Sequence, residues 1–126
     1  MGTFSTMSGS EMEIMRVIWS RGAPVTVGDL LEAFAHRGWK AQTMSTFLSR
    51  LVEKGILHSR RQGRGNLYVP AVSEAEYRRL AARQVVEQLY DGSLSAFLSA
   101  LSGGQGLERR EVEELRAWFE EVCGHD

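Results

Sequence analysis

The chain of 126 residues has little cysteine and little proline: Cys123 stands alone, and there are only two prolines. One cysteine excludes an internal disulfide and the multi-thiolate sites of structural zinc, so we expect a reducing compartment, the cytoplasm by default. No apolar run approaches the roughly 20 residues of a membrane-spanning helix, and the first residues lack a charged leader followed by an apolar stretch. We therefore expect neither membrane insertion nor secretion.

Charge is divided unevenly along the chain. The net charge is −1, but residues 1–72 carry nine lysines and arginines against five acidic residues, whereas residues 73–126 carry six against eleven. A hydrophobic content of 43% is enough to build a core at this length. These observations predict two regions with different tasks, residues 1–72 and residues 73–126.

The first region begins with two short helices. Ser8 and Glu11 have the spacing of a capping box and predict a helix from about Gly9 to Trp19. Thr26, with Asp29 three residues later, predicts the start of a second helix. Both helices carry apolar residues at spacings of three and four, which predicts that each buries one side in a common core.

A third helix and a hairpin follow. Apolar residues at helical spacing predict a helix over residues 41–54, with Gly55 as its stop signal. Residues 56–61 and 66–69 are strand candidates, and residues 62–65 between them form a turn with two glycines. A short amphipathic helix directly before such a hairpin is the layout of a winged helix-turn-helix, a module that reads DNA.

The same stretch is strongly basic. Between residues 37 and 64 the only carboxylate is that of Glu53, whereas the cations are Arg37, Lys40, Arg50, Lys54, Arg60, Arg61 and Arg64. A positive surface of this size is typical of a protein with a polyanionic partner. The polar side of the predicted helix carries short hydrogen-bonding side chains, which suit base edges in a major groove. Trp39, just before this helix, is expected to pack in the core and fix the helix angle.

We predict that ten residues of this stretch contact DNA. Near the start of the helix, Gln42 can bridge N6 and N7 of adenine, and its serine and threonine neighbours can meet base edges or phosphates. Farther along, basic side chains are expected to bind phosphate, and Arg64 at the tip of the hairpin can reach a minor groove. The predicted DNA-binding residues are Lys40, Gln42, Thr43, Ser45, Thr46, Arg50, Lys54, Arg60, Arg61 and Arg64.

In the second region, the sequence predicts three helices over about residues 73–90, 94–101 and 108–122. A glycine-rich linker separates the last two. Helices so short and so separated make a poor independent core, whereas pairing with a second copy would stabilise them by roughly 25 cal/mol per Å² of apolar surface buried. We therefore expect a homodimer. Its predicted interface consists of Leu80, Val85, Leu89, Phe97, Leu98, Leu101, Leu115, Trp118 and Phe119.

The expected fold is thus mostly α with a small β-wing: an N-terminal winged helix-turn-helix and a C-terminal helical dimerisation region. Several ordered motifs carry a resemblance. They are Glu11-Met12-Glu13-Ile14-Met15 with Trp19, Trp39, Thr43-Met44-Ser45-Thr46, Leu48, Arg50-Leu51-Val52-Glu53-Lys54-Gly55, Tyr68-Val69-Pro70 and Asp91-Gly92-Ser93. Over about residues 7–121 the chain resembles the BlaI/MecI/CopY family of penicillinase repressors.

The resemblance implies a bacterial homodimeric repressor that binds double-stranded DNA with an inverted-repeat operator. It implies release by a signal linked to cell-wall or β-lactam stress, with a membrane sensor or a cytoplasmic protease as a further partner. Three features depart from the family pattern. Ala100-Leu101 stands where β-lactam-responsive members have a cleaved Asn-Phe bond, Cys123 stands where copper-responsive members have a cysteine-rich motif, and Lys40 and Gln42 replace a serine and a lysine.

Two other functions are weighed against DNA binding. A winged-helix module that binds an acidic protein through the same basic surface would not need specific DNA, and competition by duplex DNA separates the two. An enzyme built on Cys123 and His125 lacks a third residue to orient the pair. We therefore expect no catalytic activity, no cofactor and no metal site.

Overall fold

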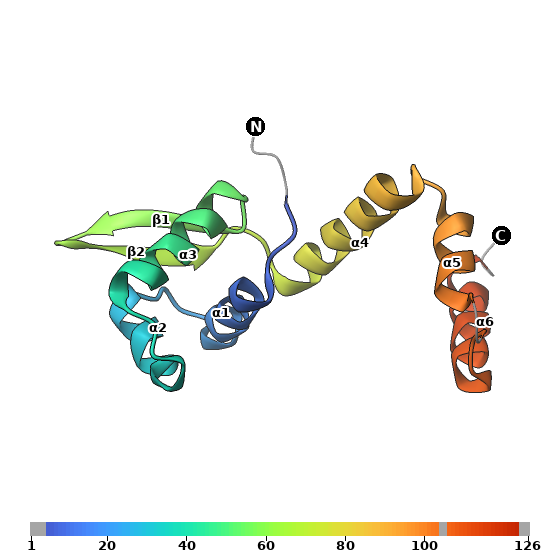
Figure 1. Cartoon of the computed structure of the whole chain (residues 1–126), viewed down its shortest axis with the longest axis horizontal. Coiled ribbons are helices and arrows are strands. Elements are labelled where there is room, and N and C mark those ends of the chain that lie inside the picture. The colour runs from blue at the N-terminus through green and yellow to red at the C-terminus, as the bar shows by residue number, and fades with distance from the viewer. Residues whose placement is uncertain (1–4, 104–105, 124–126) are drawn as a thin grey trace. The chain divides into compact units, whose positions relative to one another are not determined.

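Helices make up most of the residues that the computed structural model describes, which are 5–103 and 106–123. In chain order the elements are α1 (Gly9–Arg21), α2 (Val27–Ala33), the 3-10 helix η1 (Ala35–Arg37), α3 (Ala41–Glu53), β1 (Leu57–Gln62), β2 (Gly65–Pro70), α4 (Glu74–Tyr90), α5 (Leu94–Ser102) and α6 (Arg109–Cys123) (Figure 1). This confirms the predicted mostly helical fold with a two-stranded wing. The chain divides into two compact units, one up to Gln84 and one from Val85.

The first two helices begin with complete capping boxes. The Glu11 amide donates to Ser8 Oγ over 3.3 Å, and the Ser8 amide donates to Glu11 Oε1 over 2.8 Å. Thr26 and Asp29 exchange the corresponding bonds at 3.1 and 2.9 Å. The bond from the Thr26 amide, helped by the Thr26 hydroxyl, lowers the pKa of Asp29 because it stabilises the charged carboxylate. The local spacing in the sequence therefore defines both helix starts.

The first unit has a single core. α1, α2, α3 and the hairpin meet around it, and α3 runs alongside the hairpin (Figure 1). Its buried hydrophobic residues are Ile14, Met15, Ile18, Val25, Leu30, Phe34, Met44, Leu48, Leu51, Ile56, Leu57, Tyr68 and Tyr77. Since all of these precede Gln84, the buried core of the described residues belongs to the first unit.

The wing is a tight antiparallel hairpin. β1 and β2 pair from Leu57 opposite Pro70 to Gln62 opposite Gly65, so the turn consists of Gly63 and Arg64 alone. Gly63 has a φ of 62°, a conformation that favours glycine at the first central position of a two-residue turn. The turn is therefore shorter than the predicted 62–65 and places Arg64 at its tip.

α4 starts within the first unit. Ser73 Oγ accepts from the Glu76 amide over 3.1 Å, and Glu76 Oε1 accepts from the Ser73 amide over 3.0 Å, which makes a third capping box. Tyr77 joins the core and Ala81 packs against it. This packing explains why the first unit extends to Gln84, beyond residue 72 where the sequence placed the boundary.

The second unit begins within α4 and contains α5 and α6. Asp91 and Gly92, with φ of 50° and 80°, turn the chain after α4, and Ser93 Oγ caps α5 by accepting from the Ala96 amide over 3.1 Å. Neither α5 nor α6 has a fully buried residue. None of the described helices is long and apolar enough to cross a membrane.

Candidate nucleic-acid interface

α3 separates its side chains into a buried and an exposed side. Met44, Leu48 and Leu51 are completely buried in the core, at 0% exposure. The polar positions Gln42, Thr43, Thr46, Ser49 and Arg50 are exposed, and Ser45 is half-buried. The apolar side of α3 is buried in the core. The side chains on α3 that the sequence assigns to DNA therefore lie on its solvent side.

The start of α3 favours a negative ligand. Lys40 is the N-cap residue and makes no side-chain capping bond, and the first turn contains no acidic residue. The first amide groups of a helix point outward and carry the positive end of the helix dipole. Thr46 differs from its neighbours, because its hydroxyl donates to the Gln42 carbonyl over 3.0 Å. This bond leaves the Thr46 oxygen lone pairs and methyl group for an outside partner.

An aromatic cluster fixes the position of this start. The ring centroid of Trp39 lies 5.3 Å from that of Phe34 and 5.0 Å from that of Phe47. The Arg37 guanidinium lies 4.4 Å above the Trp39 ring and also forms bonds of 2.9 and 2.7 Å with the two Glu13 oxygens. Trp39 thus packs as predicted, and the Arg37 cation is engaged within the protein.

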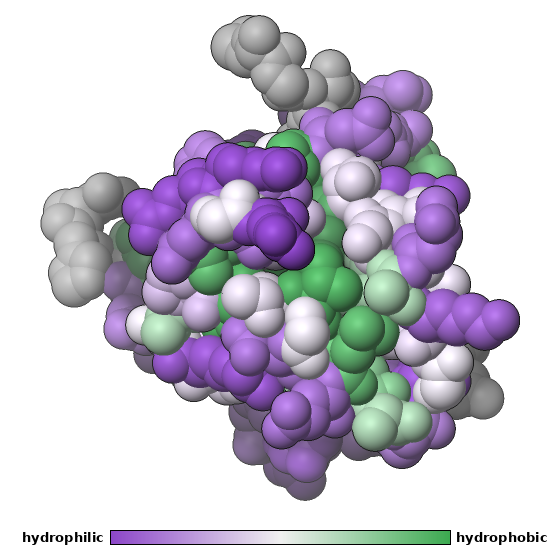
Figure 2. Space-filling view, turned by 90° about the vertical axis from the view of Figure 1, so that its left-hand side faces the viewer, coloured by the Kyte–Doolittle hydropathy of each residue, from purple (hydrophilic) through white to green (hydrophobic). Residues whose placement is uncertain are grey.

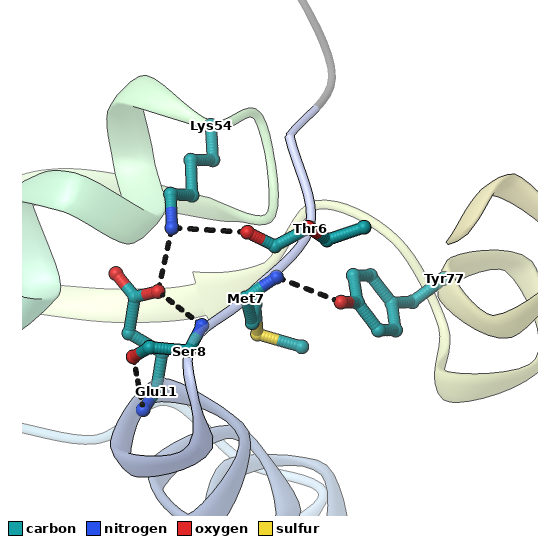
Figure 3. Close-up of polar contacts among 6 residues, drawn as sticks. All are labelled: Thr6, Met7, Ser8, Glu11, Lys54 and Tyr77. Atoms are coloured by element: carbon teal, nitrogen blue, oxygen red, sulfur yellow. Dashed lines mark hydrogen bonds and ion pairs between the residues drawn. The ribbon is translucent and has the colours of Figure 1, made fainter. Parts of the chain in front are cut away.

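Lys54 does not lie among the free cations. Its Nζ is 2.6 Å from Glu11 Oε1 and 3.1 Å from the carbonyl oxygen of Thr6 (Figure 3). Glu11 is only 2% exposed, and the side chain of Lys54 is 24% exposed. The structure therefore pairs the Lys54 ammonium with an internal carboxylate, whereas the sequence-based prediction assigned it to a phosphate. The partner lies 43 residues away, and no local sequence signal identifies it.

The pKa of Glu11 reflects two opposing effects. Burial acts to raise it, but the hydrogen bonds from Lys54 and the Ser8 amide, with the charge of Lys54, outweigh burial and leave the pKa lowered. Within the described residues, Glu11 Oε2 has no hydrogen-bond partner. Glu11 is therefore held as a charged, buried anion whose main support is the Lys54 ammonium.

The wing presents its arginines on different sides. Arg60 pairs with Leu67 and Arg61 pairs with Asn66, and successive residues of a strand point to opposite faces. Arg60, Arg61 and Arg64 are all exposed, and none forms an ion pair with another described residue. The wing therefore offers three cations to an outside anion, with Arg64 at the tip and the other two directed apart.

Figure 2 looks onto the side of the molecule that carries the wing, where hydrophilic side chains surround an apolar band. An open hollow of about 360 Å³ lies between the start of α2 and the wing. It is lined by Thr26, Val27, Gly28, Gln62, Gly65, Asn66 and Leu67. This lining contains no acid, base or thiol, and the Thr26 hydroxyl is already the cap of α2.

Comparison with known proteins decides the family. The sequence profile of the family described as "Penicillinase repressor" matches residues 7–121, nearly the whole chain. The chain belongs to the penicillinase repressor family. This confirms the predicted relationship to the BlaI and MecI repressors, a family of transcriptional repressors.

Individual relatives match the chain over most of their length. The Penicillinase repressor of Bacillus licheniformis is 29% identical over 115 residues, which cover 91% of this chain and 90% of the relative. The Methicillin resistance regulatory protein MecI of Staphylococcus aureus (strain N315) is 23% identical over 110 residues, 87% of this chain and 89% of the relative. The solution structure of the DNA-binding domain of the repressor BlaI covers 61% of this chain and 94% of that domain, with a TM-score of 0.53 and 29% identity.

This penicillinase-repressor chain leaves large apolar side chains exposed on its C-terminal helices. Of the predicted interface residues, Leu80, Leu89, Leu101, Trp118 and Phe119 are 42–72% exposed, and Val85, Phe97, Leu98 and Leu115 are half-buried. Leu94, Val112 and Val122 are exposed as well; the sequence-based interface omitted them although they recur at helical spacing. Within the described residues, every exposed large hydrophobic side chain lies on α4, α5 or α6.

No group of three or more histidine, cysteine or acidic side chains is arranged to hold a metal ion among the residues described. Cys123 is exposed at the end of α6, and His125, its proposed companion, lies outside the described residues.

Proposed function

We propose that the chain is a homodimeric transcriptional repressor that binds a palindromic operator through its winged helix. The observation that carries this proposal is the exposed polar side of α3, which lies beside a wing whose three arginines form no ion pair with the residues that the structure describes. The family membership and the similarity to the DNA-binding domain of BlaI support the same conclusion. A helix of this kind reads base edges, and the wing adds backbone contacts.

The contacts divide into two groups. Gln42, Thr43, Ser45 and Thr46 are the candidates for base edges, since they occupy the first two turns of α3. Lys40, Arg50, Arg60, Arg61 and Arg64 are the candidates for phosphates, and Arg64 can also enter a minor groove. We assign Lys54 to neither group, because its ammonium is bound to Glu11.

The second copy would cover the exposed apolar side chains of α4, α5 and α6. A dimer would set two recognition helices about 34 Å apart, one turn of DNA, or a multiple of it. We propose that release follows β-lactam or cell-wall stress, which the names of the penicillinase and methicillin relatives suggest. A membrane sensor or a cytoplasmic protease would then act at a bond other than Ala100-Leu101.

Two substitutions test the division of the proposed site into phosphate contacts and base contacts. Arg64→Ala is expected to weaken binding to all duplexes alike and to reduce the salt dependence by about 0.9 in log K per decade of salt, because one phosphate contact is lost.

Gln42→Ala is expected to change the preference at one base pair by about 1–3 kcal/mol, because it removes a base contact. Fluorescence anisotropy with duplexes selected from a random pool measures both effects.

Arg16→Ala is the matched control, since Arg16 is an exposed arginine of α1 outside the proposed interface. It should leave affinity, salt slope and base preference unchanged. Absence of any salt-dependent binding by the wild-type chain would overturn the proposed function. Binding to an acidic protein that duplex DNA fails to displace would instead favour a protein interaction module.

A further inference from the structure

Two hydrogen bonds hold the residues just before α4 against the winged helix. The Ala71 amide donates to the Ile56 carbonyl over 2.8 Å, which holds the chain before α4 against the residues that follow α3. Trp19 Nε1 donates to the Val72 carbonyl over 3.0 Å, which holds it against α1. The connection between β2 and α4 is therefore fixed from two elements of the core.

A third tie comes from the segment before α1. The Met7 amide donates to the Tyr77 hydroxyl over 2.8 Å, and the Lys54 ammonium binds the Thr6 carbonyl over 3.1 Å (Figure 3). Residues 6–8 thus lie between the end of the recognition helix α3 and the first turn of α4, and bond to both. Ser8 joins this segment to the start of α1 through its capping box with Glu11.

Tyr77 is the residue through which this segment can orient α4. Its side chain is only 7% exposed, and its ring centroid lies 6.1 Å from that of Trp19. Packing fixes where the ring sits, and the hydroxyl fixes how the helix that carries it is turned, because a hydrogen bond tolerates little angular deviation. The hydrogen bond from the Met7 amide to the Tyr77 hydroxyl joins residues that are 70 positions apart, so it links the segment before α1 to α4.

The direction of α4 has a large effect at its far end. α4 has 17 residues, so its axis is about 25 Å long at 1.5 Å per residue. A change of about 10° at its root would move its far end by about 4 Å, which exceeds the roughly 3.4 Å rise of one base pair. Leu80 and Leu89 are exposed on α4 itself, so in a dimer that pairs through α4 the direction of this helix would contribute to the distance between two recognition helices.

We propose that residues 6–8 form a clasp that fixes the direction of α4 relative to α3, with Tyr77 and Lys54 as positioning residues for the half-site spacing of the operator. This inference rests on the proposed function. It assigns specificity for spacing to residues that touch no DNA, and it separates that specificity from base reading by α3.

Tyr77→Phe tests the clasp, since phenylalanine keeps the ring and removes only the hydroxyl. Affinity for a single half-site should stay at the wild-type value. The preference for the selected palindrome over the same palindrome with one base pair inserted or deleted at its centre should fall roughly tenfold, because bivalent binding depends on geometry. In the free protein, hydrogen exchange at the Met7 amide should accelerate, since that amide loses its acceptor.

Tyr90→Phe is the matched control, as it removes a tyrosine hydroxyl from the other end of the same helix. It should leave both the spacing preference and the Met7 exchange unchanged. Wild-type spacing preference in Tyr77→Phe, or unchanged exchange at Met7, would overturn the clasp while the repressor function stands. Failure of the wild-type chain to bind any duplex would overturn the function, and the spacing role with it.

Discussion

Lys54→Met should lower the free energy of unfolding by about 3 kcal/mol, because it leaves a buried carboxylate without its cation. Glu11 is 2% exposed and receives its shortest bond, 2.6 Å, from Lys54 Nζ. The double variant Glu11→Gln/Lys54→Met should recover most of the loss, since the amide carries no charge and still accepts from the Ser8 amide. Urea denaturation followed by tryptophan fluorescence measures both variants.

Arg78→Met is the matched control for this prediction. It breaks the exposed pair with Glu74, in which the arginine side chain is 66% exposed, and should cost at most about 0.5 kcal/mol. An equal loss in Lys54→Met and Arg78→Met would contradict the view that Glu11 depends on Lys54. So would a double variant that is no more stable than Lys54→Met.

The dependence on pH follows from the same carboxylate. The pKa of Glu11 is lowered in the folded state, so its contribution to stability is present above the unfolded-state pKa and is lost as pH falls through the folded-state pKa. In Lys54→Met, the buried carboxylate loses its support and protonates more readily. The stability gap between wild type and Lys54→Met should therefore narrow as pH falls from neutral to acid, measured by urea unfolding at several pH values. A gap that stays constant with pH would point to lost packing alone.

Phe119→Asp is expected to separate the proposed dimer into monomers and to lower the affinity for a full palindrome by roughly 10²–10³-fold. Phe119 is 48% exposed on α6 and pairs edge-on with Trp118, whose ring centroid is 5.0 Å away. A carboxylate placed at the centre of an apolar interface is desolvated without a partner. Light scattering after size exclusion gives the mass, and anisotropy gives the affinities for the palindrome and for a single half-site.

Ala117→Asp is the control, because it adds the same carboxylate to the same helix away from the apolar stripe. Ala117→Asp should remain dimeric, and half-site affinity should be unchanged in both variants since the winged helix is untouched. A dimeric Phe119→Asp variant would contradict the proposed interface. Far-UV circular dichroism establishes that α6 still forms.

Local patterns in the sequence were sufficient for the elements and for the recognition helix. The capping boxes at Ser8, Thr26 and Ser73 depend on residues three positions apart, so their spacing alone predicts helix starts. The apolar period of α3 determines which side is buried, and it therefore predicts that Gln42, Thr43 and Thr46 face solvent. The two glycines near Arg64 predict a hairpin because few residues adopt the turn that it requires.

Contacts between distant residues were decided by the tertiary structure alone. Composition places Arg37 and Lys54 in one basic stretch with the wing arginines, but folding pairs Arg37 with Glu13, 24 residues away, and Lys54 with Glu11, 43 residues away. An ion pair between distant residues forms only where their helices or strands pack together. The order of charges along the chain does not predict that packing. The sequence by itself thus determined the helices, the wing and the exposed side of α3. Only the packing of α1, α3 and α4 decided which cations of the described residues form internal ion pairs and where the first unit ends.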